Sequence, residues 1–249
     1  MPAPVVCLDM DQTLVDWSWA DIVRSSALAQ GQGVSTARFV AYLHEGAARP
    51  DLGPFLADLA YFKAQKQISE VVMFTAATNK TGWVDFAVAC IEEFAQCPKL
   101  FDRVLHRKDT FLDGGLMVKD MRRVTAGPVL MIDDRPECVI NGPVLAVPAW
   151  SASVDPAQLT RDSESGVQSQ LHKMWTRTRP GCDSDAVLKQ CIAAITRFVR
   201  TTQQDEHLAQ LAAQRLQAPA DSTPSIRRCP THVSLVALAI QAAEMPRYD

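Results

Sequence analysis

Two aspartates follow a short apolar segment near the start of the chain, at a spacing that suits phosphoryl transfer. The segment Val5–Leu8 leads directly into Asp9 and Asp11. Because it is short and β-branched at its start, it predicts a buried strand. Side chains two residues apart on an extended chain point the same way, so both carboxylates should converge just past the strand end. That carboxyl edge is where open α/β sheets hold their ligands.

Two carboxylates this close require a cation, a shared proton or water between them. A hard cation such as Mg²⁺ takes one or two carboxylates together with phosphate oxygens. One aspartate could attack phosphorus while the other handles the leaving-group proton. Asp is also common in turns, so the same spacing is compatible with two solvated residues after a strand. The spacing alone leaves both interpretations open.

Three further segments place polar side chains at the carboxyl end of a predicted strand or just before a helix. They supply a hydroxyl, an ammonium and a second pair of carboxylates: Thr75 after residues 71–74, Lys119 after the turn at 113–115, and Asp133 and Asp134 after residues 129–132. A phosphate and a divalent ion together need about those parts. Taken singly, the hydroxyl could cap a helix and the lysine could lie on the surface.

These segments, in this order, resemble motifs I to IV of the haloacid dehalogenase (HAD) phosphotransferases. In detail they resemble one branch, the phosphatases of the RNA polymerase II C-terminal domain and the NLI-interacting-factor-like proteins. The resemblance covers about residues 4–155 and rests on D-x-D-x-T-L-V at 9–15, R-P-x-x-x-x-F-L at 49–56, F-T-A at 74–76, an Arg twelve residues before V-K-D at 118–120, D-D-x-P at 133–136 and V-P-x-W at 147–150. One such motif is weak evidence, whereas the ordered set is specific.

The resemblance implies a role for each matched polar residue. Asp9 would be the nucleophile that becomes phosphorylated. Asp11 would act as general acid and then as the base that activates water. Thr75, Arg107 and Lys119 would hold the phosphoryl oxygens. Arg107 lies between two other basic residues, so a solvated basic turn is the alternative for it.

The same resemblance implies Mg²⁺ as the cofactor. Asp9, Asp133 and the backbone carbonyl of Asp11 would coordinate the ion. Asp134 and Thr13 would act just behind these ligands or on a metal-bound water. Asp134 occupies a position that is Asn in some relatives.

The expected architecture is α/β: a Rossmann-like HAD fold with a central, mostly parallel sheet. Residues 1–155 would form the phosphatase core, with a small insert after the first strand at about 16–48, and residues 156–249 a helical C-terminal extension. Residues 184–217 contain no Gly or Pro and carry apolar residues on one side, which predicts an amphipathic helix. Further helices are predicted at 167–178 and 233–244. The extension is expected to pack on the core, with a docking or dimerisation surface as the alternative.

The insert at 16–48 is ambiguous. In the polymerase-tail phosphatases this interval holds a small three-stranded insert that helps to bind the peptide. Here residues 39–44 could be a strand of such an insert, yet residues 19–24 and 35–40 also resemble helix starts, and periodicity cannot decide over such short segments. The aromatic residues of this region could line a substrate groove or pack a small cap; they are Trp17, Trp19, Phe39 and Tyr42.

Composition is that of an ordinary globular protein. The 249 residues are 47% hydrophobic and 21% charged, with a formal net charge of −3. This charge gives no global attraction to nucleic acid or membrane, and the longest apolar segment, residues 233–243, is too short to span a bilayer. The seven cysteines show no zinc-type spacing, which favours a reducing compartment. With a strand starting by about residue 4 in place of a signal peptide, an intracellular protein, cytoplasmic or nuclear, is expected. Because the branch includes compact proteins of large DNA viruses, a viral origin stays open.

Together these observations predict Mg²⁺-dependent hydrolysis of phosphomonoesters through an aspartyl-phosphate. By resemblance, the substrate would be phosphoserine or phosphothreonine in a phosphoprotein or phosphopeptide, as in the polymerase tail. Two alternatives stay open: an HAD phosphatase of a small phosphorylated metabolite, and a catalytically silent interaction module. The sequence makes no prediction of the oligomeric state.

Overall fold

The three predicted apolar strands form the centre of a five-stranded parallel sheet in the computed structural model, which describes residues 2–17, 20–152 and 186–217. The strand order is β3-β2-β1-β6-β8. Their bounds are β1 (Val5–Leu8), β2 (Glu70–Phe74), β3 (Arg103–Leu105), β6 (Val129–Asp133) and β8 (Val144–Ala146). Because β1 is paired with β2 on one side and with β6 on the other, the predicted α/β Rossmann-like fold is confirmed.

Successive side chains of the central strands alternate between two apolar cores. In β1, Val6 and Leu8 point into the larger core, which the helices cover, while Val5 and Cys7 point into a smaller core on the opposite face. β2 and β6 follow the same period of two, as extended chains require. Each strand is therefore buried on both faces, which explains its continuous apolar sequence.

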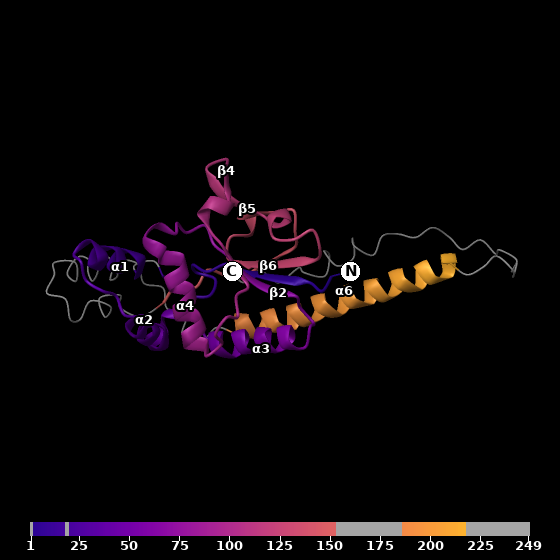
Figure 1. Cartoon of the computed structure of the whole chain (residues 1–249), viewed down its shortest axis with the longest axis horizontal. Helices are drawn as coiled ribbons and strands as arrows, with labels where there is room; N and C mark the ends of the chain where they lie inside the picture. Colours follow the sequence, from indigo (N-terminus) through magenta and orange to yellow (C-terminus); the bar gives the residue numbers. More distant parts are fainter. Residues whose placement is uncertain (1, 18–19, 153–185, 218–249) are drawn as a thin grey trace, which may run out of the picture. The chain divides into compact units, whose positions relative to one another are not determined.

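Helices pack against one face of this sheet and beside it. Their bounds are α1 (Ala20–Ala29), α2 (Thr36–Tyr42), α3 (Leu52–Ala64), α4 (Trp83–Ala95) and α6 (Val187–Gln217). Short helical turns of 3-10 or π type are η1 (Leu43–Ala47), η2 (Lys80–Gly82), η3 (Arg107–Asp109), η4 (Met121–Arg123) and η5 (Pro136–Cys138). Figure 1 shows α3 below the sheet and α4 beside it.

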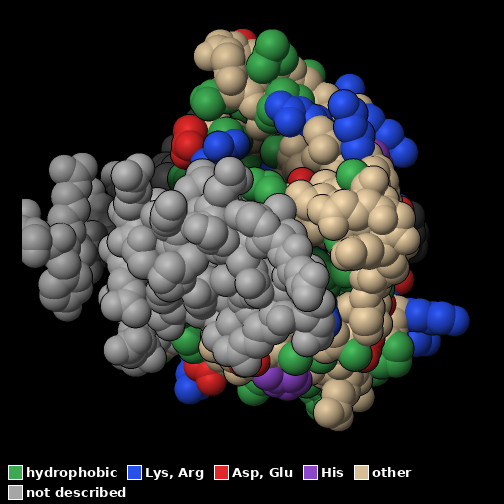
Figure 2. Space-filling view, turned by 90° about the vertical axis from the view of Figure 1, so that its left-hand side faces the viewer, with side chains coloured by type: hydrophobic (Ala, Val, Ile, Leu, Met, Phe, Trp, Pro, Cys, Tyr) green, Lys and Arg blue, Asp and Glu red, His purple; other side chains and the backbone are tan. Residues whose placement is uncertain are grey.

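A second, three-stranded sheet lies on the opposite side of the central sheet from α3 (Figure 1). It consists of β4 (Phe111–Asp113), β5 (Leu116–Asp120) and β7 (Val139–Ile140). The β4–β5 turn holds Gly114 and Gly115 at φ 53° and 86°, a region that glycine adopts without strain. At this end of the molecule, hydrophobic side chains lie beside several Lys and Arg side chains (Figure 2). Leu112 of the hairpin is 69% exposed.

In the insert between the first two motifs, the described residues from 20 to 47 form α1, α2 and η1, joined by a short irregular segment at 30–35. Phe39, Tyr42 and Leu43 are buried, at the i, i+3, i+4 spacing of one helical face. Phe39 meets Phe86 of α4 with 4.9 Å between ring centroids, and Trp17 lies 5.5 Å from the ring of Trp83.

Of the two alternatives that the sequence left open, a strand or helices, the structure has helices, and one face of α2 buries its aromatic side chains, with Phe39 packed on α4. The same packing decides whether these aromatic residues line a substrate groove or pack inward. Trp17, Phe39 and Tyr42 pack into the core and do not line a groove. Trp19 lies outside the described residues.

Helix α6 confirms the amphipathic helix predicted at 184–217. Its residues Leu188, Cys191, Ile195 and Val199 are buried in the larger core, so this part of the extension packs on the core as expected. Its residues up to Ala209 belong to a compact unit that runs from Met1 to Ala209, and its last residues, from Gln210, belong to a second unit.

Three predictions about the extension fall outside the described residues: the boundary at 155/156 and the helices at 167–178 and 233–244. None of the described helices is both long and apolar enough to cross a bilayer.

Candidate active site

Asp9 and Asp133 come to the same face of the sheet because of strand periodicity. Asp133 is the last residue of β6, and Asp9 follows β1 and continues its pairing by donating its N–H to the carbonyl of Ile132 at 2.9 Å. Both continue the series of odd-numbered residues that point away from α3, into the smaller core. At the strand ends this face meets β5, which carries Lys119.

Lys119 joins the two aspartates. Its Nζ donates to Asp133 Oδ2 at 2.7 Å and makes a second, close ion pair with Asp9 Oδ1. All three side chains are buried. Burial alone would lower the pKa of Lys119, but the two carboxylates raise it above its ordinary value, so the group stays an ammonium. Burial raises the pKa of both Asp9 and Asp133, and the lysine opposes this effect.

Asp11 lies beside the hydroxyl group at the end of β2. Thr75 Oγ1 donates to Asp11 Oδ2 at 3.2 Å and accepts a hydrogen bond from the N–H of Ala77 at 3.1 Å. Burial, together with the nearby Asp9 carboxylate, raises the pKa of Asp11 to about 7, against the hydrogen bond from Thr75. A carboxyl group with that pKa can hold a proton near neutral pH and release it there, as a general acid and base must.

Three carboxylates form a group that could hold a metal ion. One oxygen from each of Asp9, Asp133 and Asp134 lies within 4.8 Å of the others. Thr13 Oγ1 donates to Asp134 Oδ1 at 2.9 Å and accepts from the Asp134 N–H at 3.0 Å, which fixes this carboxylate. An all-oxygen donor set with several charges suits Mg²⁺. The side chain of Asp11 is not in this group, so a metal role for it is left to its backbone carbonyl.

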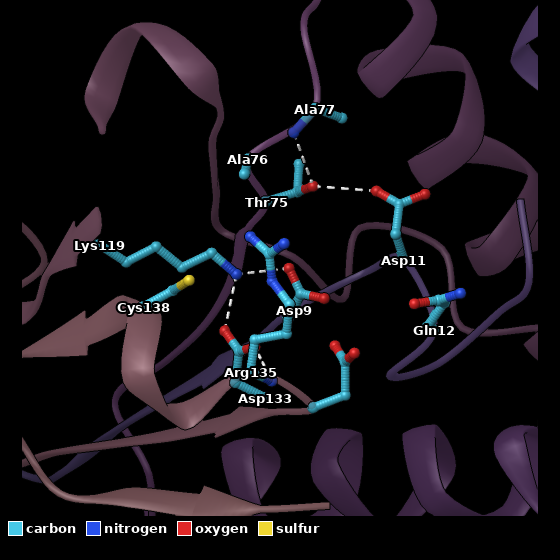
Figure 3. A pocket seen from close by; sticks show the side chains of 11 residues that line it. Asp9, Asp11, Gln12, Thr75, Ala76, Ala77, Lys119, Asp133, Arg135 and Cys138 are labelled. Carbon is cyan, nitrogen blue, oxygen red and sulfur yellow. Dashed lines mark hydrogen bonds and ion pairs between the residues drawn. The ribbon is translucent and has the colours of Figure 1, made fainter. Parts of the chain in front are cut away.

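These residues surround a cavity of about 230 Å³ (Figure 3). It is lined by Asp9, Asp11, Gln12, Thr75, Ala76, Ala77, Lys119, Asp133, Asp134, Arg135 and Cys138. The fold therefore brings together six of the predicted residues, and Thr13 supports the cavity from behind through Asp134. Arg107 is apart from them: its side chain is exposed, it does not line the cavity, and only its N–H reaches the cavity wall, through the carbonyl of Ala77 at 3.0 Å.

The loop that carries Asp11 and Thr13 is anchored by a buried arginine. Arg49 is 1% exposed, and its guanidinium donates to the carbonyl of Thr13 at 2.8 Å and to the carbonyl of Pro148. Gln12 adopts φ 61° in the same loop, where it exposes its carbonyl to the N–H of Trp150. The R-P motif thus supports the catalytic loop, a role that the sequence pattern did not reveal.

Besides the alanines at 76 and 77, sequence reasoning missed three lining residues: Gln12, Arg135 and Cys138. Gln12 lies between the predicted Asp11 and Thr13, and Arg135 directly follows Asp134, so their position beside predicted residues was the available signal. Cys138 lies in η5, which returns towards β5, and its place in the cavity depends on that path. Burial raises the pKa of its thiol, which keeps it protonated.

Comparison with known proteins supports the resemblance seen in the sequence. A family model described as NLI interacting factor-like phosphatase matches residues 4–161. That range contains the central sheet, the helices α1 to α4 and every residue of the cavity. A comparison with curated proteins gave no match.

Proposed function

The chain belongs to the NLI interacting factor-like phosphatase family, and we propose that it hydrolyses phosphomonoesters through an aspartyl-phosphate on Asp9. One observation carries the proposal. The Asp9 carboxylate lines the cavity and shares the buried Lys119 ammonium with the Asp133 carboxylate, and Asp11, whose pKa is raised to about 7, lines the same cavity. A nucleophile, a cation for the phosphoryl oxygens and an acid-base group are what two-step phosphate transfer needs.

In the first step, a carboxylate oxygen of Asp9 attacks phosphorus and the bond from phosphorus to the leaving oxygen breaks. Asp11 gives its proton to that leaving oxygen, so the product departs as a neutral alcohol. In the second step, the Asp11 carboxylate takes a proton from water, whose oxygen attacks the same phosphorus. The bond between phosphorus and Asp9 breaks, releasing inorganic phosphate and restoring Asp9. Lys119 and Thr75 hold the phosphoryl oxygens during both steps.

Mg²⁺ fits the carboxylate group of this site. Asp9 and Asp133 would hold the ion together with the Asp11 carbonyl, and Asp134 would act on a metal-bound water. When bound, the ion neutralises charge on the phosphoryl group and orients it for attack. Among the described residues, Lys119 is the cation that pairs with the buried Asp9 and Asp133, so a divalent ion would further reduce the repulsion between these two carboxylates.

We propose phosphoserine or phosphothreonine in a peptide as the substrate. No described residue between 20 and 48 lines the cavity, and the aromatic side chains of that region are packed inward. The cavity is bordered by an exposed side chain, that of Arg135. A phosphate at the end of a peptide side chain can reach such an open site, whereas a small metabolite would gain little enclosure there.

An activity panel in Mg²⁺ tests this proposal. Phosphoserine and phosphothreonine peptides would be compared with small phosphorylated sugars and nucleotides, by phosphate release under identical conditions. We expect kcat/KM to be at least about tenfold higher for the peptides, which is a difference of roughly 1.4 kcal/mol in transition-state binding. A preference for one metabolite would favour the metabolite alternative, and a lack of any hydrolysis would favour the silent interaction module.

A further inference from the structure

Arg135 lies at the rim of the cavity, next to the acidic residues but outside their chemistry. Its N–H donates to Asp133 Oδ1 at 2.8 Å, and Pro136 begins η5 directly after it. The backbone is therefore held from both sides. Figure 3 shows the side chain extending over the cavity and not away from it.

The guanidinium group of Arg135 makes no hydrogen bond or ion pair with the part of the chain that the structure describes. Other arginines of the protein have partners. Arg103 pairs with Glu70 at 2.8 Å through its Nε, and the guanidinium of Arg122 lies 2.7 Å from a carboxylate oxygen of Asp120. Arg135 thus offers a complete set of donors at the cavity entrance.

Arg135 is more exposed than the groups that would hold the transferred phosphoryl group. Asp9, Thr75, Lys119 and Asp133 have between 1% and 5% of their surface exposed, whereas Arg135 is exposed. A phosphoryl group held by these buried residues would lie in the inner part of the cavity of about 230 Å³. The arginine therefore faces the part of the substrate that stays outside.

Building on the proposed phosphatase activity, we propose that Arg135 binds a second anionic group of the substrate. This group is a carboxylate or a phosphate on a residue close to the phosphorylated one. The guanidinium fork donates two parallel hydrogen bonds to either group, a geometry that lysine cannot match. The favoured substrate is then a phosphopeptide with an acidic or second phosphorylated residue beside the reacting phosphoserine or phosphothreonine.

Matched phosphopeptides test this inference. A neutral peptide, with alanines around one phosphoserine, would be compared with peptides that carry a single glutamate or a single second phosphoserine at each of the two positions on either side. We expect the best anionic peptide to exceed the neutral one about tenfold in kcat/KM. The glutamate and phosphoserine series tell which anion is preferred.

Substitutions of Arg135 then show whether this residue causes the preference for anionic peptides. In Arg135→Ala and Arg135→Gln the ratio between anionic and neutral peptides should fall to about one, and in Arg135→Lys it should be intermediate because charge remains without the fork. The matched control Arg200→Ala, on the exposed face of α6, should keep the wild-type ratio.

Two results would overturn the proposed role of Arg135 and leave the proposed phosphatase activity intact. One is hydrolysis of all peptides by the wild type without preference. The other is an equal loss for neutral and anionic peptides in the Arg135 variants, which would place the guanidinium on the transferred phosphoryl itself. If the wild type hydrolysed neither these peptides nor p-nitrophenyl phosphate, the phosphatase activity would be rejected and the inference with it.

Discussion

At the scale of single residues, the two aspartates of the first motif differ in environment. Asp9 is held by a buried ammonium, whereas Asp11 lies beside a neutral hydroxyl. Lys119 opposes the burial that raises the pKa of Asp9, whereas burial and the Asp9 carboxylate raise the pKa of Asp11 to about 7, which allows this carboxyl to carry a proton near neutral pH. These contacts support the proposed roles of Asp9 as nucleophile and Asp11 as acid.

Asp9→Asn should abolish turnover and keep the fold. The amide has nearly the same shape but is a poor nucleophile, so kcat for p-nitrophenyl phosphate should fall by roughly a thousandfold or more. Circular dichroism would monitor folding, and Asp205→Asn, at an exposed position on α6, is the matched control. Activity within about tenfold of the wild type would rule out Asp9 as the nucleophile.

Because the pKa of Asp11 is raised to about 7, the pH dependence of kcat/KM should differ between substrates with poor and with good leaving groups. The first step uses the protonated form, so kcat/KM for a phosphoserine peptide should fall as the pH rises through about 7. An aryl phosphate with a good leaving group needs little protonation, and its profile should be flatter over the same range. Two profiles of equal slope would mean that Asp11 does not protonate the leaving group.

At the scale of secondary structure, α6 supports the phosphatase core although it lies beyond the family match. The family model ends at residue 161, yet Leu188, Cys191, Ile195 and Val199 are buried in the same core as the central sheet. Lys189 also pairs with Asp51, next to α3, at 3.0 Å. The start of α6 is therefore part of the folding unit that holds the site.

Ile195→Ala should destabilise the whole unit. Its side chain is fully buried, and a truncation of this kind costs about 2–4 kcal/mol in the free energy of unfolding through lost burial and the cavity left behind. Urea unfolding measures the change, with Gln190→Ala on the exposed side of α6 as control. A loss below about 0.5 kcal/mol would show that α6 is dispensable for the core.

The elements differ in how far sequence could predict them. β1, β2 and β6 are continuous apolar segments with a polar end, and α6 is long enough for its period to be clear. The insert was ambiguous because α2 has only seven residues, and its helical state depends on packing with Trp83 and Phe86 of α4, which no local pattern contains. The place of Asp9 and Asp133 followed from parallel strands, whereas that of Lys119 depends on a second sheet and was predicted only by resemblance.

At the scale of the whole molecule, Mg²⁺ should stabilise the fold. The proposed ion site exists only when the sheet brings Asp9 together with the neighbouring pair Asp133 and Asp134, which lies far from it in the sequence. Binding at a hundredfold excess over Kd adds about 2.7 kcal/mol to the free energy of unfolding. Thermal unfolding with and without Mg²⁺ measures this shift, and Asp133→Asn should reduce it strongly. An unchanged Tm together with full activity in excess EDTA would contradict the metal site.

The most direct test of the central claim is to trap the phosphorylated enzyme. In Asp11→Asn, an activated aryl phosphate should still phosphorylate Asp9, but the base that activates water is missing, so the intermediate should accumulate. Rapid quenching followed by peptide mass spectrometry locates the phosphate. We predict phosphate on the peptide that contains Asp9, and none when Asp9→Asn is added. Loss of all turnover in Asp11→Asn without any phosphorylated peptide, or phosphate on another residue, would contradict the account.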